Sequence, residues 1–314
     1  MIITIDKAEE LLFKGELVAI PTETVYGLAA LYTDLKAINS IFVTKGRPSD
    51  NPIIVHISNL DQLNQITDEI TERHKVLIDA FWPGPLTLIF KKLPSVFDRI
   101  TGGLETVAVR MPSHPIALQL IEKVGPIVAP SANKSGKPST TRVEHILHDY
   151  SGYIPVIDGG ICEIGLESTV LDCTNEQFGS LLRPGKITQK DLSAVLNDYL
   201  IETPKIGHSS IQPKSPGMKY THYAPNALVR WMNTAELEGV FEENIRYLFV
   251  HGKFNSSQNK GYSSNFELFS KELFDQFRFA DDNNELEIAI EPFSAEDNAL
   301  APALLNRIQK AMVR

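Results

Sequence analysis

The stretch LVAIPTETVYGLAA, residues 17–30, carries the pattern that decides the fold. Its first four residues are apolar, which predicts a short buried β-strand. Pro21 ends this strand because proline cannot donate to the hydrogen-bond ladder of a sheet. Thr22, Glu23 and Thr24 then present two hydroxyls and a carboxylate. Polar residues at the end of a buried strand are typical of binding sites in α/β proteins, although an ordinary turn with solvated threonines is the alternative.

The same alternation of strand-like and helix-like runs continues to about residue 200. Runs rich in Val and Ile predict strands at 17–20, 52–57, 86–90, 107–111, 126–130, 153–157, 169–173 and 180–183. Three S/T-x-x-D/E patterns predict helix starts, at Ser58 with Asp61, Thr141 with Glu144, and Thr188 with Asp191. The last two strands leave no room for a crossover helix, so we expect an α/β (α+β) fold with a mixed sheet.

The chain length predicts more than one domain. At 314 residues it is about twice the usual domain length of roughly 150 residues. The segment 205–227 has three prolines, two glycines, three lysines and no acidic residue, which is a linker composition. Residues 228–314 then alternate strand, helix, strand and helix, which predicts a small Rossmann-like C-terminal domain without a GxGxxG fingerprint. We therefore predict domains at 1–204 and 228–314.

Composition and charge narrow the function classes. Hydrophobic residues make up 43% and charged residues 22%, as in folded globular proteins. The net charge of −9 argues against broad nucleic-acid binding, which needs a surplus of Lys and Arg. No apolar run approaches the roughly 20 residues of a membrane helix, and the N-terminus has no export signal, so we expect a cytoplasmic protein without a membrane partner.

Metal and disulfide chemistry find little support in the sequence. Cys162 and Cys173 are too few for a disulfide framework and do not stand in a zinc-ligand spacing. His145 and His148 are three residues apart on a predicted helix, but no third ligand lies nearby in sequence. We therefore predict no protein-built metal site. The eight acidic residues within 275–298 favour a solvated acidic face, with docking to a basic partner as the alternative.

Four cationic residues stand at predicted strand ends or in proline-bounded loops. Lys45 and Arg47 flank Gly46, Arg110 stands near the end of a predicted strand, and Arg183 precedes a Pro-Gly pair. Arginine offers a planar fork and lysine a point charge to phosphate oxygens. Four convergent cations would suit a polyphosphate, whereas a solvated loop is the alternative for the first pair.

Polar residues follow two further predicted strands. Ser131, Asn133 and Ser139 come after the strand at 126–130, and such a stretch can present hydroxyls and backbone N–H groups to an anion or a nucleobase. Ser168 stands at the start of the strand at 169–173. Thr106 lies four residues before Arg110 and shares its strand face. His56 lies in a predicted strand, where an isolated histidine is more often a satisfied core residue.

Eight motifs in chain order are similar to those of the threonylcarbamoyl-AMP synthase family. They are PTETVYGL, KGRPSDNPIIVHI, WPGPLT, VAVRMPSHP, APSANKSGKPS, GLESTV, LRPG and SPGMKYTHYAP. The motifs span residues 15–225, and the tail matches more loosely. The chain resembles the long form of the family, in which a YrdC-like catalytic domain with a twisted mixed sheet and flanking helices is joined through a linker to a small C-terminal domain.

This resemblance implies a reaction in which L-threonine, bicarbonate and ATP give L-threonylcarbamoyl-AMP and pyrophosphate. The product serves threonylcarbamoyl-adenosine formation beside the anticodon of tRNA, so the implied partner is the downstream tRNA threonylcarbamoyl transferase machinery, with weak RNA binding as a further expectation. Magnesium would arrive with ATP. A non-catalytic tRNA- or double-stranded-RNA-binding module and a carbamoyl-phosphate-using transferase are the alternatives, and the second would predict cysteine motifs that this chain does not have.

The resemblance also assigns residues position by position. Lys45 and Arg47 are the implied catalytic pair against the ATP phosphates. The other implied nucleotide contacts are Asn51, Ser131, Asn133, Ser139, Arg183 and Tyr223. The implied threonine contacts are Thr24, His56, Arg110, Ser168 and the backbone of Ala129, while Thr106 would contact either ligand. The linker would close over the site, with Pro216 and Gly217 setting its turn.

Overall fold

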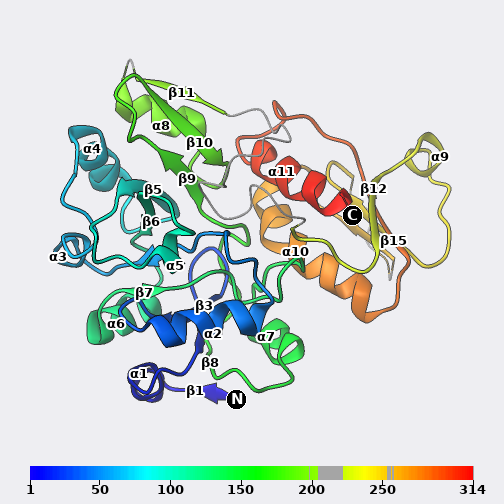
Figure 1. Ribbon diagram of the computed structural model, residues 1–314. Helices are drawn as coiled ribbons and strands as arrows, with labels where there is room; N and C mark the ends of the chain where they lie inside the picture. The colour runs from blue at the N-terminus through cyan, green and yellow to red at the C-terminus, as the bar shows by residue number, and fades with distance from the viewer. Residues whose placement is uncertain (198, 204–221, 253–255, 257, 314) are drawn as a thin grey trace.

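The computed structural model describes residues 1–197, 199–203, 222–252, 256 and 258–313. Within this part of the chain the strands form one large and one small sheet (Figure 1). The strands of the large sheet are, in spatial order, β1 (Ile2–Ile3), β8 (Val156–Ile157), β2 (Val18–Ile20), β3 (Gly27–Leu31), β7 (Ile127–Val128), β4 (Val55–His56), β6 (Thr106–Arg110), β5 (Leu86–Lys91), β9 (Thr169–Asp172), β10 (Phe178–Arg183) and β11 (Leu200–Glu202).

The large sheet is mixed, as its closely spaced strands predicted. β9 and β10 pair antiparallel, and so do β5 and β6. β4 and β6 pair parallel, and β11 adds to β10 in parallel. The predicted strands at 17–20 and 107–111 correspond to β2 and β6. The parallel pairing of β11 keeps the chain in the first sheet as far as Glu202.

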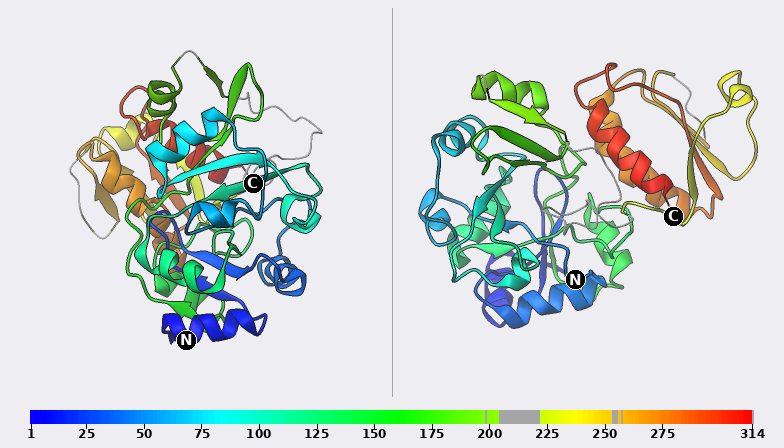
Figure 2. Two further views of the ribbon diagram at one scale, coloured as in Figure 1. Left: turned by 90° about the vertical axis from the view of Figure 1, so that its left-hand side faces the viewer. Right: turned by 45° about the horizontal axis from the view of Figure 1, so that its top comes forward.

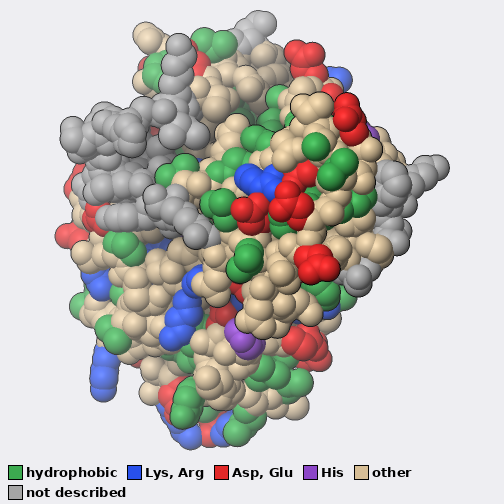
Figure 3. Space-filling model, turned by 90° about the vertical axis from the view of Figure 1, so that its right-hand side faces the viewer, with side chains coloured by type: hydrophobic (Ala, Val, Ile, Leu, Met, Phe, Trp, Pro, Cys, Tyr) green, Lys and Arg blue, Asp and Glu red, His purple; other side chains and the backbone are tan. Residues whose placement is uncertain are grey.

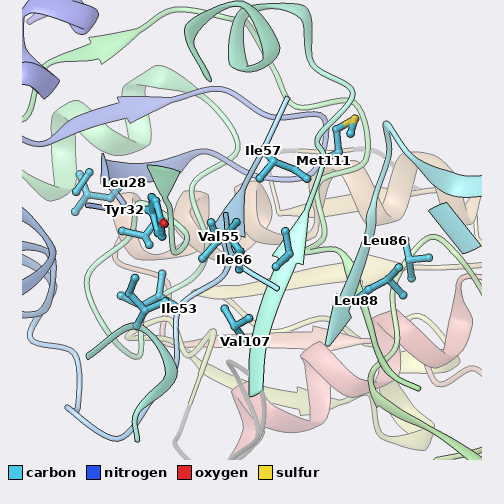
Figure 4. Packing of buried hydrophobic residues seen from close by; sticks show 14 of the residues in the cluster. Leu28, Tyr32, Ile53, Val55, Ile57, Ile66, Leu86, Leu88, Val107 and Met111 are labelled. Atoms are coloured by element: carbon cyan, nitrogen blue, oxygen red, sulfur yellow. The ribbon is translucent and has the colours of Figure 1, made fainter. Parts of the chain in front are cut away.

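Helices cover both faces of this sheet. Alternate residues of β2 belong to different apolar clusters, Ala19 to one and Val18 to the other, because successive side chains of a strand point to opposite faces. The smaller cluster packs under α1 (Ile5–Phe13) and α6 (Pro115–Val124). The larger one contains the residues of Figure 4. It packs against α2 (Leu35–Lys45), α4 (Glu72–Phe81), α7 (Val143–Asp149) and α8 (Gln189–Leu196). Two further helices of one turn are α3 (Leu60–Leu63) and α5 (Asp98–Thr101).

The three predicted helix starts have different outcomes. The side chains of Thr188 and Asp191 form a reciprocal capping box at α8, as predicted. The prediction at Ser58 is wrong by one residue, because Asn59 caps α3 while the Ser58 hydroxyl donates to Glu122 at 2.9 Å. The prediction at Thr141 is also wrong. Helix α7 begins after Arg142 without a side-chain cap.

The C-terminal part has a four-stranded sheet in which every pair is parallel. Its spatial order is β12 (Leu228–Trp231), β15 (Glu287–Ile290), β13 (Ile245–Phe249) and β14 (Asn259–Gly261). Its helices are α9 (Thr234–Leu237), α10 (Phe266–Asp282) and α11 (Ala301–Met312). This matches the predicted Rossmann-like alternation. None of the helices in the described residues has the length and apolar character needed to cross a bilayer.

Helices α10 and α11 lie between the two sheets (Figures 1 and 2). Arg278 on α10 donates two hydrogen bonds to the carboxylate of Asp149, at 2.7 and 2.8 Å, and a third to the carbonyl of Pro138. Asp275 on the same helix pairs with Arg142 at 2.8 Å and with His145 at 3.2 Å. Charged side chains of the C-terminal part therefore contact the first sheet's domain directly.

The sequence predicts a solvated face for the acidic stretch 275–298, and the structure shows that this prediction is wrong for several of its residues. Asp275 contacts the first domain, and the carboxylate of Asp281 accepts from the backbone N–H groups of Asn226 and Ala227. Glu287 pairs with Arg230 at 2.5 Å. The acidic side chains visible in Figure 3 are scattered rather than joined in one patch. Several of these carboxylates thus have partners within the chain.

Candidate active site

A hollow of about 650 Å³, including its opening to solvent, lies at the meeting point of several strand ends and loops. Among the described residues its wall comes from segments within 22–27, 47–56, 129–139, 167–168 and 222–223, together with Arg110 and Arg183. These segments end or begin at β2, β4, β6, β7, β9 and β10. The polar clusters after the predicted strands therefore meet in one place.

Three of the four predicted cations line this hollow, namely Arg47, Arg110 and Arg183. Arg183 donates from Nε to the carbonyl of Ser168 at 2.9 Å and from Nη2 to the hydroxyl of Ser168 at 3.1 Å. Burial, followed by the charge of Arg183, lowers the pKa of Arg47 to about 10. The guanidinium groups repel one another across a partly dehydrated space, which favours an anion between them.

Arg110 is held on three sides. Its Nη1 donates to the hydroxyl of Thr24 at 2.8 Å, its Nε donates to the carbonyl of Gly84 at 3.1 Å, and its Nη2 lies 2.5 Å from a carboxylate oxygen of Glu23. Burial raises the pKa of Glu23, but the charge and hydrogen bond of Arg110, together with hydrogen bonds from the backbone, outweigh this effect, and the pKa lies below its usual value. Glu23 therefore stays ionised beside the guanidinium.

Lys45 lies behind the wall rather than in it. Its ammonium donates to the carbonyl of Ser131 at 2.5 Å and to the carbonyl of Asn133. Burial moves the pKa of Lys45 well below its usual value. The contact fixes the loop that carries Ser131 and Asn133 into the hollow. Direct contact of Lys45 with phosphate stays a prediction.

Asn51 and Thr106 also lie outside the wall. The Asn51 side chain accepts from Nη2 of Arg47 at 2.9 Å, so it orients that guanidinium. Thr106 shares the face of Arg110, but it starts β6 and pairs with Lys91, whereas Arg110 ends the strand opposite Thr87. The four-residue spacing shows that Thr106 and Arg110 share a strand face. It does not show that they lie at opposite ends of the strand, so that only Arg110 reaches the hollow. The contacts of Asn51 and Thr106 with ligands stay predictions.

The remaining predicted contacts all line the hollow, namely Thr24, His56, Ala129, Ser131, Asn133, Ser139, Ser168 and Tyr223. His56 is buried and its Nδ1 lies 3.3 Å from the carbonyl of Ile54. Burial, then the charge of Arg110, lowers the pKa of His56 to about 3, so its ring is neutral at ordinary pH. Pro216, Gly217 and the proposed lid turn lie outside the described residues.

Glu167 is a pocket residue that the sequence reasoning missed. It lines the hollow and is buried, although it belongs to the quoted motif GLESTV. The sequence does not show which cation pairs with Glu167. A carboxylate would repel a polyphosphate in this hollow unless a cation neutralised it. That cation is Arg307, 140 residues away in sequence. His222, beside Tyr223, also lines the wall and was not predicted.

Glu167 is the one carboxylate among the described residues that line the hollow. Among the described residues there is no group of three or more His, Cys, Asp or Glu side chains placed to hold a metal ion. Glu23 and Glu167 are each engaged by an arginine, at 2.5 and 2.9 Å.

Comparisons with known proteins cover nearly the whole chain. A family model described as "Telomere recombination" matches residues 10–185, and one described as "Threonylcarbamoyl-AMP synthase, C-terminal domain" matches residues 187–312. A Bacillus subtilis protein named threonylcarbamoyl-AMP synthase is 43% identical, over 98% of this chain and 92% of its own. One of the same name from Pyrococcus abyssi is also 43% identical, over 95% and 91%.

Solved structures agree with this likeness. A crystal structure of the Pyrococcus abyssi protein complexed with L-threonine superposes with a TM-score of 0.87 at 40% identity, covering 98% of this chain and 94% of that one. The agreement includes both sheets, since the match extends over nearly the full length of each chain.

Proposed function

Because the chain belongs to the threonylcarbamoyl-AMP synthase family, we propose that it converts L-threonine, bicarbonate and ATP to L-threonylcarbamoyl-AMP and pyrophosphate. The observation that carries this proposal is the convergence of Arg47, Arg110 and Arg183 in one hollow lined with serine and threonine hydroxyls. Guanidinium groups suit the oxygens of a triphosphate and of an amino-acid carboxylate. This reading favours an enzyme over a non-catalytic RNA-binding module.

The nucleotide would occupy the side of the hollow formed by Arg47, Arg183 and the loop carrying Ser131, Asn133 and Ser139. The pKa of Arg47, about 10, keeps this guanidinium charged at neutral pH. Two separately anchored guanidinium groups can contact different phosphates. Lys45 would act on the nucleotide through the loop carbonyls that it binds.

Threonine would occupy the side formed by Thr24, His56, Arg110 and Ser168. Arg110 is fixed by Thr24, Gly84 and the carboxylate of Glu23, so its guanidinium is already oriented when threonine binds. A neutral His56 offers a hydrogen bond without adding charge. The Ser168 hydroxyl, held by Arg183 and by Thr87 at 2.7 Å, lies between the two ligand positions.

The chemistry then needs positioning rather than a protein nucleophile. The threonine amine and bicarbonate form a carbamate with loss of water, and a carbamate oxygen attacks the α-phosphorus of ATP. The bond between the α-phosphorus and the bridging oxygen breaks, and pyrophosphate leaves with that electron pair. Negative charge that develops on the departing group is stabilised by fixed guanidinium groups.

Several further assignments belong to the same proposal. Magnesium would enter with ATP as the counterion of its phosphates. The unstable adenylate would pass to the tRNA threonylcarbamoyl transferase machinery, with weak RNA binding of the enzyme itself, and the whole sequence would run in the cytoplasm.

The test is pyrophosphate release by the purified protein with magnesium and ATP, with and without threonine and bicarbonate. We expect release to require both co-substrates, and mass spectrometry to detect threonylcarbamoyl-AMP. Arg110→Lys should raise the KM for threonine more than that for ATP, because a lysine cannot form the two-pronged contact. Arg47→Gln should do the reverse. Lys36→Gln, an exposed cation on α2 outside the hollow, is the control.

Other outcomes would overturn the proposal. Pyrophosphate release that ignores threonine would indicate a different nucleotidyl acceptor. RNA binding without any turnover would instead support the non-catalytic module.

A further inference from the structure

Arg307 on α11 is a fully buried arginine of the C-terminal part that reaches into the wall of the active-site hollow. Its side chain is 0% exposed. Nε donates to Glu167 Oε2 at 2.9 Å, and Nη2 lies 3.3 Å from the carbonyl oxygen of the same residue. Nη1 donates to the carbonyl of Pro184 at 2.7 Å. One guanidinium thus contacts two separate stretches of the first domain.

Both of these stretches carry site residues. Glu167 directly precedes Ser168, and Pro184 directly follows Arg183. Arg183 is in turn bonded to the carbonyl and hydroxyl of Ser168. Arg307 therefore fixes the backbone carbonyls of Glu167 and Pro184, which are the direct neighbours of the wall residues Ser168 and Arg183.

The carboxylate of Glu167 extends this contact to a third segment. Its Oε2 receives Arg307, while its Oε1 accepts from the hydroxyl of Ser139 at 2.5 Å. Each carboxylate oxygen of Glu167 therefore accepts a hydrogen bond, and the bond to Oε1 fixes the direction of the Ser139 hydroxyl proton. The three segments joined through Arg307 are the ones that hold Ser139, Ser168 and Arg183 in the wall.

Charge gives the contact a second consequence. An unpaired Glu167 carboxylate in this wall would repel a polyphosphate and attract Arg183. Burial alone would raise the pKa of Glu167, but the charges of Arg307 and then Arg183 outweigh it, and the pKa lies below its usual value. Arg307 neutralises the carboxylate from the far side, so the charge of Arg183 remains available to a ligand.

We propose that Arg307 is a positioning residue of the nucleotide site, through which helix α11 of the C-terminal part fixes Glu167, Ser168 and Arg183 for ATP. The inference rests on the proposed function, because it assigns the hollow to a polyphosphate. Domain docking alone does not require Arg307 at this place. The pair of Asp275 on α10 with Arg142 already joins the two parts outside the residues that line the hollow.

The kinetic test compares Arg307→Gln with the unchanged protein in the pyrophosphate assay. We expect the KM for ATP to rise by about tenfold to a hundredfold, with a smaller change in the KM for threonine, because nucleotide groups are misplaced. The double variant Arg307→Gln with Glu167→Gln should recover part of the loss, because it removes the uncompensated carboxylate. A merely structural role predicts that Arg307→Gln changes the KM for ATP and the KM for threonine alike.

Lys186→Gln is the matched control. Lys186 also joins the two parts, through Glu267 at 2.7 Å, but this pair is exposed and outside the wall. We expect its ATP kinetics to match those of the unchanged protein. An ATP KM within about twofold in Arg307→Gln, or a double variant without recovery, would overturn the inference.

Hydrogen–deuterium exchange without substrate separates this inference from the proposed function. We expect Arg307→Gln to speed exchange in the peptide 166–173 and Lys186→Gln to leave it unchanged. If the unchanged protein releases no pyrophosphate, the proposed function fails while the exchange result still reports whether Arg307 orders the wall. Unchanged exchange in Arg307→Gln would count against the inference even in an active enzyme.

Discussion

His56 illustrates, at the scale of a single residue, how burial sets the charge state of a site. The ring is 3% exposed and its Nδ1 faces a backbone carbonyl. Burial and the neighbouring Arg110 lower the pKa to about 3, against an ordinary value of 6.5. A neutral ring can sit beside Arg110 without competing with that guanidinium for a carboxylate.

The displaced pKa of His56 predicts a pH dependence of stability. Above pH 6.5 neither the folded nor the unfolded state binds a proton here. Below that value the unfolded state binds one and the folded state does not until about pH 3, so the free energy of unfolding falls as the pH drops. We expect a contribution of about 1 kcal/mol for each pH unit below 6, which His56→Gln should remove.

Urea unfolding between pH 7 and 5 measures this difference. The decline of the free energy of unfolding should be steeper in the unchanged protein than in His56→Gln. Equal slopes in the two proteins would show that His56 titrates normally in the folded state.

The sequence predicts which cationic residues share a site better than it predicts the contacts around each of them. Arg47, Arg110 and Arg183 share the hollow, as strand ends bounded by proline suggested. Lys45 differs because two loop carbonyls, 86 and 88 residues away in sequence, receive its ammonium. Contacts of this kind depend on how loops from distant segments meet, which local patterns do not encode.

At the scale of elements, the loop before β9 packs tightly against α10. Gly165 has φ +77°, and a Cβ there would lie 2.5 Å from Lys271 Cα and 2.6 Å from the Ser270 carbonyl oxygen. The Ser270 hydroxyl donates to the carbonyl of Ile164 at 3.1 Å. Only a residue without a side chain allows the helix and the loop to approach this closely.

Gly165→Ala should therefore lower the free energy of unfolding by more than about 2 kcal/mol, because it combines backbone strain with a clash against helix backbone. Gly152→Ala is the matched control, since Gly152 has φ +76° and nothing within 4 Å of the added carbon. We expect about 1 kcal/mol there. Urea unfolding of both variants is the measurement, and equal losses would show that the contact with α10 is not tight in solution.

Elements with strong local signals were predictable, and those defined by their neighbours were not. Runs of Val and Ile such as LTLIF correspond to β5, and the Thr188 capping pattern correctly marks α8. β14, with the sequence NKG, is a strand only because it pairs with β13. The predicted start of α7 is wrong because Thr141 does not cap the helix. Its backbone N–H donates instead to the ring of His145.

At the scale of the whole molecule, the two parts are joined by buried charge pairs. Arg278 and Asp149 are each 9% exposed at the side chain. Removing the arginine would leave a buried carboxylate without its partner, which is costly. We expect Arg278→Gln to lower the free energy of unfolding by about 3 kcal/mol.

Lys186→Gln is again the comparison, because its pair with Glu267 is 39% and 74% exposed and should contribute less than about 1 kcal/mol. Urea midpoints of the two variants test this order. A loss in Lys186→Gln as large as that in Arg278→Gln would contradict the assignment of interface strength to buried pairs.

The two-part organisation could be predicted from the sequence, but the interface could not. Linker composition and the strand–helix alternation indicate a second unit after residue 227. Nothing in the sequence pairs Asp275 with Arg142, or Glu167 with Arg307, since these pairs depend on how α10 and α11 face the first sheet. The acidic stretch looked solvated for the same reason.

The mutual repulsion of Arg47, Arg110 and Arg183 also has a bearing on turnover. Any anion that relieves this repulsion binds in the hollow. The pyrophosphate released by the proposed reaction carries much of the charge of ATP, so it would bind there as well. The enzyme would then be inhibited by its own by-product, so sustained synthesis would depend on hydrolysis of pyrophosphate elsewhere, and phosphate or sulfate buffers would slow the reaction in the same way.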